Sequence, residues 1–480
     1  MSIKQEMVSG VFWIGVQKYT GVAVQLLVSA ILARLLSPEN FGVIAISTVI
    51  ITFFGIFTNM GIGTAVIQNK TLTRDDLNSI FSFTIYTGIC LSAIFFFCSY
   101  PIARFYGNDQ LIPICQLLSI NLLFVSWNLV PGSLILKDKR FKFVAVRTFS
   151  LQVLCGTLSV LAAFLGAGVY ALLITPIVTS VALFCINYRQ YPLHPSVRVV
   201  WSSLKKIFGY SVFQMLFIFF NFFSRNLDKL IVGRFFTLHD LGYYEKSYRL
   251  MLMPLEYVSS LLGGVMHPVL SSLQDDYAEL ASKYNKIVRF MSYISFTVGV
   301  MCFFAADDAI LFVFGDQWGQ AVPIFRVFSL SLPLQMVLSS TGSIYQAAGK
   351  TNWMFYGGLS NTFCTVSGYL IATFCFGTII SIAWAWDVTL IINTVISFTI
   401  LYKLVLRASL RTLVRQLTGP VCCAAVVTLL LAAADAVKPA MPHFANLCVY
   451  GLLSLSVLLA SLQITGQVDL RWAWRKIRRK

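Results

Sequence analysis

The chain has 480 residues, of which 58% are hydrophobic and 11% are charged, and its mean hydropathy is +0.78. A soluble domain carries about 25% charged residues, so this composition excludes a water-exposed surface over most of the chain. The net charge of +17 does not indicate a nucleic-acid partner, because the basic residues cluster in short segments between apolar runs, as in multi-pass membrane proteins.

Apolar runs long enough to cross a bilayer, about 20 residues each, recur along the whole chain. They predict an all-α polytopic membrane protein with about fourteen transmembrane helices. The predicted spans are 11–36, 41–67, 79–100, 111–136, 144–165, 169–187, 210–235, 250–270, 287–304, 322–348, 355–376, 379–402, 420–437 and 447–466.

Loop charges indicate the orientation. With the N-terminus inside, most lysines and arginines fall in cytoplasmic loops and in the tail "RWAWRKIRRK", so both termini are predicted to be cytoplasmic. Arg234, Lys246 and Arg249 oppose this pattern, because they fall on the outer side. Two basic segments, 196–209 and 406–417, are predicted to lie as helices in the membrane interface, where they suit anionic lipid headgroups.

The chain carries an internal repeat. At an offset of 200 residues "RLLSPENFG" aligns with "RFFTLHDLG", and at about 210 residues "PICQLLSINL" aligns with "PIFRVFSLSL". Matches in constant order at a fixed offset indicate duplication. They predict two pseudo-symmetric six-helix lobes plus two C-terminal helices: residues 1–207, 208–405 and 406–480. Six helices return the chain to the same side, so both lobes have one orientation.

Each lobe begins with a helix that carries a polar stripe. Lys18, Gly21, Gln25 and Ser29 share one face of the first helix, because they are three and four residues apart. The predicted seventh helix carries a similar stripe, formed by Gln214, Asn221, Arg225 and Asp228. A charge at the bilayer centre costs about 2.5–3.5 kcal/mol, so both stripes are predicted to face a water-filled cavity between the lobes.

The predicted cavity is cationic and suits an anion, because arginine binds phosphate oxygens through two parallel hydrogen bonds. Two alternatives remain open: Arg225 and Asp228 form an intrahelical pair, or Lys18 extends to the cytoplasmic surface. The candidate substrate-binding residues are Lys18, Gln25, Gln214, Asn221, Arg225, Asp228, Lys229 and Arg326.

Three carboxylates within apolar runs, Asp228, Glu256 and Asp387, are candidates for ion coupling by a proton or sodium ion. The alternative for the last two is a capped or interfacial acid. Asp307 and Asp308, near a helix end, are predicted to be interfacial.

Catalytic and metal-binding motifs are not found in the sequence. There is no Walker A, HExxH or GxSxG pattern, and the eleven cysteines form no CxxC pair. We therefore expect no catalytic residue, no metal and no cofactor.

The segments "NLDKLIVGRFFTLHDLGYYEKSYRL", "HPVLSSLQDD" and "FGDQWGQAVPIFRVFSLSLP" resemble the bacterial polysaccharide transporter family. These are the O-antigen and exopolysaccharide flippases of the multidrug/oligosaccharidyl-lipid/polysaccharide superfamily. The resemblance covers nearly the whole chain. It implies twelve core helices plus two, and ion-coupled alternating access that moves undecaprenyl-pyrophosphate-linked oligosaccharides across the bacterial inner membrane, with polysaccharide polymerase machinery as a partner.

Other classes of protein remain as alternatives. A multidrug or other small-solute exporter would have the same two lobes, but the basic stripe does not suit cationic substrates. A major-facilitator transporter has six plus six helices, but "QNKTLTRDDLNS" lacks the usual loop after the second helix. A polysaccharide polymerase would need catalytic charges in large outer loops, which the sequence lacks.

Overall fold

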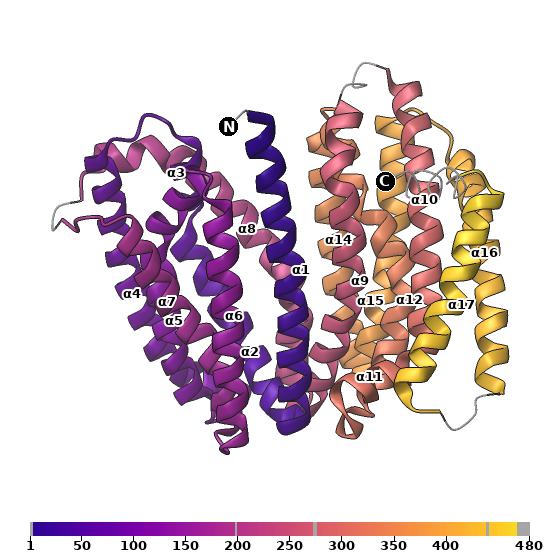
Figure 1. The fold of residues 1–480 in the computed structure, drawn as a ribbon, viewed down its shortest axis with the longest axis horizontal. Helices are drawn as coiled ribbons and strands as arrows, with labels where there is room; N and C mark the ends of the chain where they lie inside the picture. The colour runs from indigo at the N-terminus through magenta and orange to yellow at the C-terminus, as the bar shows by residue number, and fades with distance from the viewer. Residues whose placement is uncertain (1–2, 197–198, 272–275, 438–440, 468–480) are drawn as a thin grey trace. The chain divides into compact units, whose positions relative to one another are not determined.

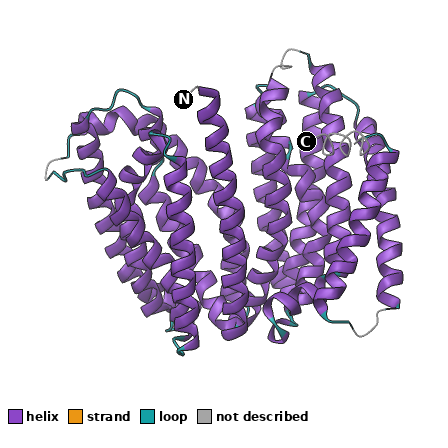
Figure 2. Cartoon of the chain, in the orientation of Figure 1, coloured by secondary structure: helices purple, strands orange, loops and turns teal. Residues whose placement is uncertain are grey.

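The computed structural model of the protein describes residues 3–196, 199–271, 276–437 and 441–467, and all regular structure in these ranges is helical (Figures 1 and 2). Helices are expected in lipid, because an α-helix satisfies its backbone hydrogen bonds within one segment. The predicted all-α polytopic fold is confirmed. The chain divides into two compact units, residues 1–242 and 243–480, whereas the predicted division into repeats at 207 and 405 stays a prediction.

The first unit contains these helices in chain order: α1 (Ile3–Leu35), α2 (Pro38–Asn59), α3 (Ile62–Gln68), α4 (Arg74–Tyr106), α5 (Leu111–Lys137), α6 (Phe141–Phe164), η1 (Gly168–Tyr170), α7 (Ala171–Gln190) and α8 (Trp201–Phe235). The first turn of α9 (Leu238–Ser271) also belongs to this unit.

The rest of α9 opens the second unit. It is followed by α10 (Tyr277–Phe304), α11 (Ala306–Phe314), η2 (Asp316–Trp318), α12 (Ala321–Ser339), α13 (Thr341–Ala347), α14 (Thr351–Ile371), η3 (Ala372–Phe376), α15 (Ile379–Thr399), η4 (Ile400–Val405), α16 (Leu410–Ala436) and α17 (His443–Ile464). The last two are the predicted pair of C-terminal helices.

The helices repeat in order and in starting position. Helices of the first half begin at Ile3, Pro38, Arg74, Leu111, Phe141 and Ala171, and their counterparts begin at Trp201, Leu238, Tyr277, Ala321, Thr351 and Ile379. The offset therefore grows from about 200 to about 210 residues along the chain, as the sequence matches predict.

Twelve helices are long and apolar enough to span a membrane in the part of the chain that the structure describes. Helices α8 and α9 occupy the positions of the predicted seventh and eighth spans without being among these twelve. The twelve spans support a multi-pass membrane protein, and the count of fourteen stays a prediction.

Several helices extend beyond the predicted apolar cores. Helix α9 begins at Leu238, where a capping box joins the side chains and backbones of Thr237 and Asp240: the Asp240 backbone N–H donates to the Thr237 hydroxyl oxygen at 3.1 Å, and the Thr237 N–H donates to the Asp240 carboxylate at 3.2 Å. The predicted interfacial segments are not separate helices either. Residues 201–209 begin α8, and residues 410–417 are the first turns of α16.

Helix pairs in the first unit approach closely at small residues. Helix α1 packs on α6, where a Cβ on Gly156 would lie 2.5 Å from a Val28 methyl carbon. Helix α4 packs on α5, where a Cβ on Gly88 would lie 2.8 Å from the Ser126 side chain, and that serine hydroxyl donates to the Thr84 carbonyl oxygen at 2.7 Å. Such small-residue contacts are typical of helix packing in membranes.

Two glycines of the first unit make a reciprocal contact between the starts of α2 and α9. A Cβ on Gly42, in α2, would lie 2.0 Å from the Leu238 carbonyl oxygen, and a Cβ on Gly242 would lie 2.1 Å from the Pro38 carbonyl oxygen. The sequence offset of the repeat relates Gly42 to Gly242 and Pro38 to Leu238. When residue i contacts j' and its counterpart i' contacts j, the two segments are related by a two-fold axis. The repeat seen in the sequence is therefore also a structural symmetry at this contact.

We predict that Gly42→Ala destabilises the folded protein, because its methyl group would collide with a backbone carbonyl that cannot rotate away. Overpacking of this kind costs about 1–3 kcal/mol. Thermal unfolding of the purified protein in detergent, followed by size-exclusion chromatography, measures the effect.

Gly55→Ala is the matched control. Gly55 lies in the same helix, and among the described residues no atom of a neighbouring helix lies within 4 Å of the position that a Cβ would occupy. An equal melting temperature for Gly42→Ala and Gly55→Ala would contradict the reciprocal contact.

Candidate functional site

The polar stripe of α1 is partly open and partly packed. Lys18 and Gln25 are exposed, whereas Gly21 is buried against α6. A Cβ on Gly21 would lie 2.9 Å from the Gln152 side-chain oxygen. The stripe therefore lies along the edge of the α1–α6 contact, and Lys18 and Gln25 lie outside that contact.

Helix α8 is held against α2 by an apolar cluster. Phe222 is 6% exposed and packs with Val49, and its ring centroid lies 5.5 Å from that of Phe53. Ile218, the sequence counterpart of Lys18, also packs into this cluster. The two first helices are thus not equivalent here, because one presents a cation where the other packs an apolar side chain.

The three charges of α8 that the sequence places at the site differ in exposure. Arg225 is exposed, Lys229 is half-buried and Asp228 is 2% exposed. Of these three, Arg225 is the most accessible to a ligand, and Lys18 of α1 is exposed as well. The side chains of Gln214 and Asn221 lie outside the described residues.

Arg326 has a partner in the second unit. Its guanidinium donates to the Asp307 carboxylate, joining α12 to α11, and both side chains are close to half exposed. The neighbouring Asp308 is buried and accepts hydrogen bonds from Asn446 at 3.1 Å and from the His443 ring at 2.7 Å. Arg326 therefore has a structural role in this unit, and a substrate contact by it stays a prediction.

Asp387 is the deeply buried carboxylate of α15. It is 4% exposed, and neither of its oxygens accepts a hydrogen bond from a described residue. The nearby Ser331 hydroxyl donates instead to the Phe328 carbonyl oxygen at 2.7 Å. An ionised carboxylate buried without a donor is costly, so this position suits a proton or a cation. Glu256, another candidate for ion coupling, is exposed.

Lys246 is expected in an outer loop from the sequence, but the structure places it within α9. The residue is 3% exposed, and its ammonium lies 5.0 Å from the Phe314 ring centroid and 5.8 Å from that of Trp318. Aromatic faces attract a cation through the ring quadrupole. On the same helix, the Arg249 guanidinium donates to the Glu245 carboxylate at 2.6 Å.

Sequence reasoning also missed a polar network in the first unit. Arg147 lies in the second turn of α6, and its guanidinium donates to the Asn187 side chain of α7. Asn187 in turn donates to the Asn128 side-chain oxygen of α5 at 2.7 Å. Both asparagines lie within predicted spans, and polar residues there are the signal that could have located the network.

A family model described as "Polysaccharide biosynthesis protein" matches residues 31–323, which is more than half of the chain. The chain belongs to this polysaccharide biosynthesis protein family. It is 26% identical to an uncharacterized membrane protein in the cps region of Klebsiella pneumoniae, over 73% of both chains. It is 23% identical to the teichuronic acid biosynthesis protein TuaB of Bacillus subtilis, over 82% of both.

Solved structures of other proteins have the same fold as this chain. The lipid II flippase MurJ in an inward closed conformation aligns with a TM-score of 0.73 and 13% identity, over 95% of this chain and 99% of that one. An inward-facing MATE family multidrug transporter of the MOP superfamily aligns with a TM-score of 0.56 and 14% identity, over 81% and 97%. The resemblance drawn from the sequence motifs is confirmed.

We predict that cysteines at positions 18 and 225 react with a membrane-impermeant thiol reagent in intact vesicles of both orientations, because both side chains are exposed and a wet cavity supplies water. Leu27→Cys is the control, since Leu27 is 65% exposed on the same helix as Lys18 but apolar, and lipid would cover it.

Labelling is measured as the increase over the native cysteines. If Lys18→Cys and Arg225→Cys stay as unreactive as Leu27→Cys, the predicted wet cavity is wrong.

Proposed function

We propose that this protein is a flippase that moves undecaprenyl-pyrophosphate-linked oligosaccharide units across the bacterial inner membrane by alternating access. It acts as a transporter rather than an enzyme, and both termini lie in the cytoplasm. The observation that carries the proposal is the pair of accessible cations, Lys18 and Arg225, on the first helix of each repeat.

The chemistry of these residues fits a lipid-linked pyrophosphate. A guanidinium forms two parallel hydrogen bonds with phosphate oxygens, and an ammonium adds a point charge. Transporters built from two repeats of the same orientation bind substrate near the midplane between their halves. Family membership and the likeness to a lipid II flippase fold support an anionic lipid-linked substrate over the cationic substrates of a multidrug exporter.

Ion coupling is assigned to Asp387 within this proposal. A carboxylate that lacks hydrogen-bond donors among the described residues is stabilised in its buried position when a proton or sodium ion is bound. Asp387 belongs to α15 of the second unit, whereas the two cations belong to α1 and α8 of the first. Coupling therefore requires that the ion and the substrate favour the same conformation.

Arg225→Ala is expected to reduce surface polysaccharide about tenfold at normal protein level, because it removes a charge-assisted bond worth ~1.5–3 kcal/mol. Lipid-linked sugars should accumulate on the inner leaflet. Polysaccharide immunoblots and extraction of lipid-linked intermediates from the host strain measure both effects.

Arg104→Ala is the control, since Arg104 is an exposed arginine in the last turn of α4. Arg225→Lys should retain part of the activity, because it keeps the charge but loses the two-pronged geometry. Full polysaccharide in Arg225→Ala would refute the assignment.

Asp387→Asn is expected to flatten the dependence of transport on pH and sodium in proteoliposomes, because the amide neither binds a proton nor balances a cation. Asn393→Ala is a control for packing, since Asn393 is a buried polar residue of the same helix. An unchanged ion dependence in Asp387→Asn would remove Asp387 from the mechanism.

A further inference from the structure

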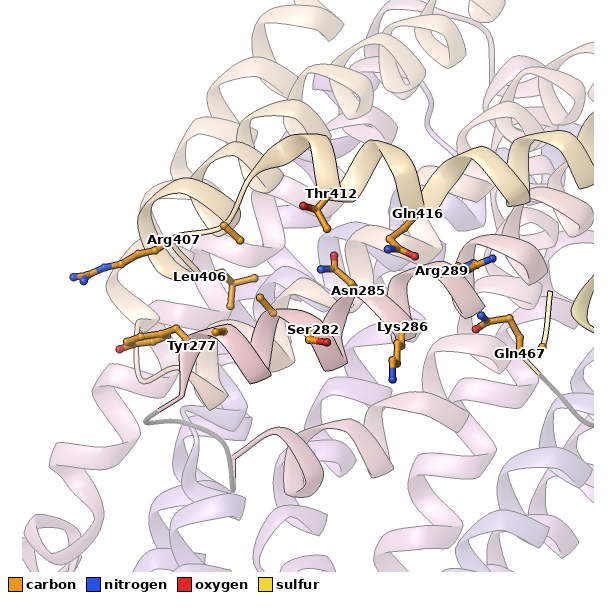
Figure 3. Close-up of a pocket in the computed structure, with 14 residues that line it drawn as sticks. Tyr277, Ser282, Asn285, Lys286, Arg289, Leu406, Arg407, Thr412, Gln416 and Gln467 are labelled. Carbon is orange, nitrogen blue, oxygen red and sulfur yellow. The ribbon is translucent and has the colours of Figure 1, made fainter.

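A large pocket with several charged and amide side chains in its lining lies at one end of the second unit, and none of the candidate residues described above lines it. Its volume is about 960 Å³, which is near the upper end of the range for small-molecule sites. The first half of α10 and the first turns of α16 line it, together with residues 406–408 between η4 and α16, and Gly466 and Gln467 after α17 (Figure 3).

The lining is cationic. Lys286, Arg289 and Arg407 contribute three positive charges, and the fourteen described lining residues include no carboxylate. Figure 3 shows Arg289 beside Gln416 in the gap between α10 and α16, whereas Arg407 extends outward at the opposite end. The pocket therefore favours an anion over a cation.

Two acids close in sequence do not cancel this charge. Asp276 accepts hydrogen bonds from the backbone N–H groups of Ala278 and Glu279 at 3.0 and 2.9 Å, which balance its carboxylate. Glu279 lies 3.8 Å from the ammonium of Lys283. Neither acid lines the pocket, so the positive charges of the lining stay available to a ligand.

Two helix N-termini border the same pocket. Helix α10 begins at Tyr277 and α16 at Leu410, and Tyr277, Ala278 and Thr412 are lining residues. The N-terminus of a helix carries about half a positive charge, but N–H groups in the first turns are already bonded here, to the Asp276 carboxylate in α10 and to the Ser409 hydroxyl in α16. The donors for a ligand are therefore the lining side chains. The C-terminal carbonyls of α17 do not oppose this field strongly, because backbone N–H groups of residues 465–467 already bond to them.

Asn285 supplies a fixed donor at the floor of the pocket. It is 7% exposed, and its side-chain oxygen accepts a hydrogen bond from the Tyr402 hydroxyl at 2.6 Å. That bond uses the oxygen and leaves the amide N–H₂ group for the pocket, where Figure 3 shows the side chain below Thr412. A donor held in place in this way favours an acceptor-rich ligand.

We propose that this pocket binds an organic phosphate: a phosphate ester held by Lys286, Arg289 and Asn285, with its organic part in the remaining volume. The volume exceeds the need of inorganic phosphate alone. Such a group is carried by anionic phospholipid headgroups, for which basic pockets between transmembrane helices are known receptors, and by soluble sugar or glycerol phosphates. The pocket shares no residue with the proposed transport site, and the inference does not rest on the proposed function.

The test uses the purified full-length protein. One arm adds phosphatidylglycerol or cardiolipin in a phosphatidylcholine nanodisc and counts retained lipids by native mass spectrometry. The other arm adds glycerol 3-phosphate to protein in neutral detergent and follows thermal stability. We expect saturable binding in one arm, weakened about tenfold or more in the double variant Lys286→Gln/Arg289→Gln, because two charge-assisted bonds are lost.

Lys283→Gln and Lys403→Gln are the matched controls. Both lysines are exposed, lie within three residues of a pocket residue and are not lining residues. The contact of Lys283 with Glu279 is a surface ion pair, which contributes little to stability. Binding in the lipid arm alone identifies a headgroup, and binding in the soluble arm identifies a free organic phosphate.

The proposal is overturned if neither probe binds, or if the control variants weaken binding as much as the double variant. Should the double variant elute as an aggregate, Lys286→Gln alone decides the question, because the Lys286 side chain is exposed and its loss leaves packing unchanged. Retained full affinity in that variant also overturns the proposal.

Discussion

The exchange of contacts between Gly42 and Leu238, and between Gly242 and Pro38, is the constraint that ties the two repeats together in the first unit. It brings the start of α2 against the start of α9 at backbone distance, so that no side chain fits between them. Each of these helices follows the first helix of its repeat. Lys18 and Arg225 therefore lie on α1 and α8, the two helices that lead into this contact.

Charges within this apolar chain fall into two groups that serve different ends. Some are satisfied inside a unit: Lys246 lies against two aromatic rings, and Asp308 is bound by His443 and Asn446. Others are accessible, as Lys18 and Arg225 are, or buried with no donor among the described residues, as Asp387 is. The second group suits transport, because an accessible or unsatisfied charge gains energy when a ligand arrives.

The sequence predicted the class of fold well, because the bilayer selects apolar segments of a definite length. Helix α5 begins at the predicted Leu111 and ends one residue after the predicted boundary. Helices α8 and α9 begin nine and twelve residues before their predicted cores. Hydropathy identifies only the apolar part of a helix, whose length matches the hydrocarbon layer. It therefore does not predict the polar turns by which a helix extends beyond that layer.

The sites were harder to predict, because partners lie far apart in the sequence. Nothing near Lys246 indicates that rings some seventy residues later cover it. The basic pocket combines three segments, two of which are separated by more than a hundred residues. Its two arginines and one lysine belong to the basic residues whose distribution indicates orientation, so their charge alone does not indicate a binding site.

The reciprocal glycine contact also carries a record of ancestry. A single six-helix ancestor, inserted with one orientation, would have contained both surfaces of this contact and could have formed it as a homodimer. Lys18 opposite Ile218, and Gln25 opposite Arg225, are differences that two copies joined in one chain can carry and that a homodimer of identical subunits cannot.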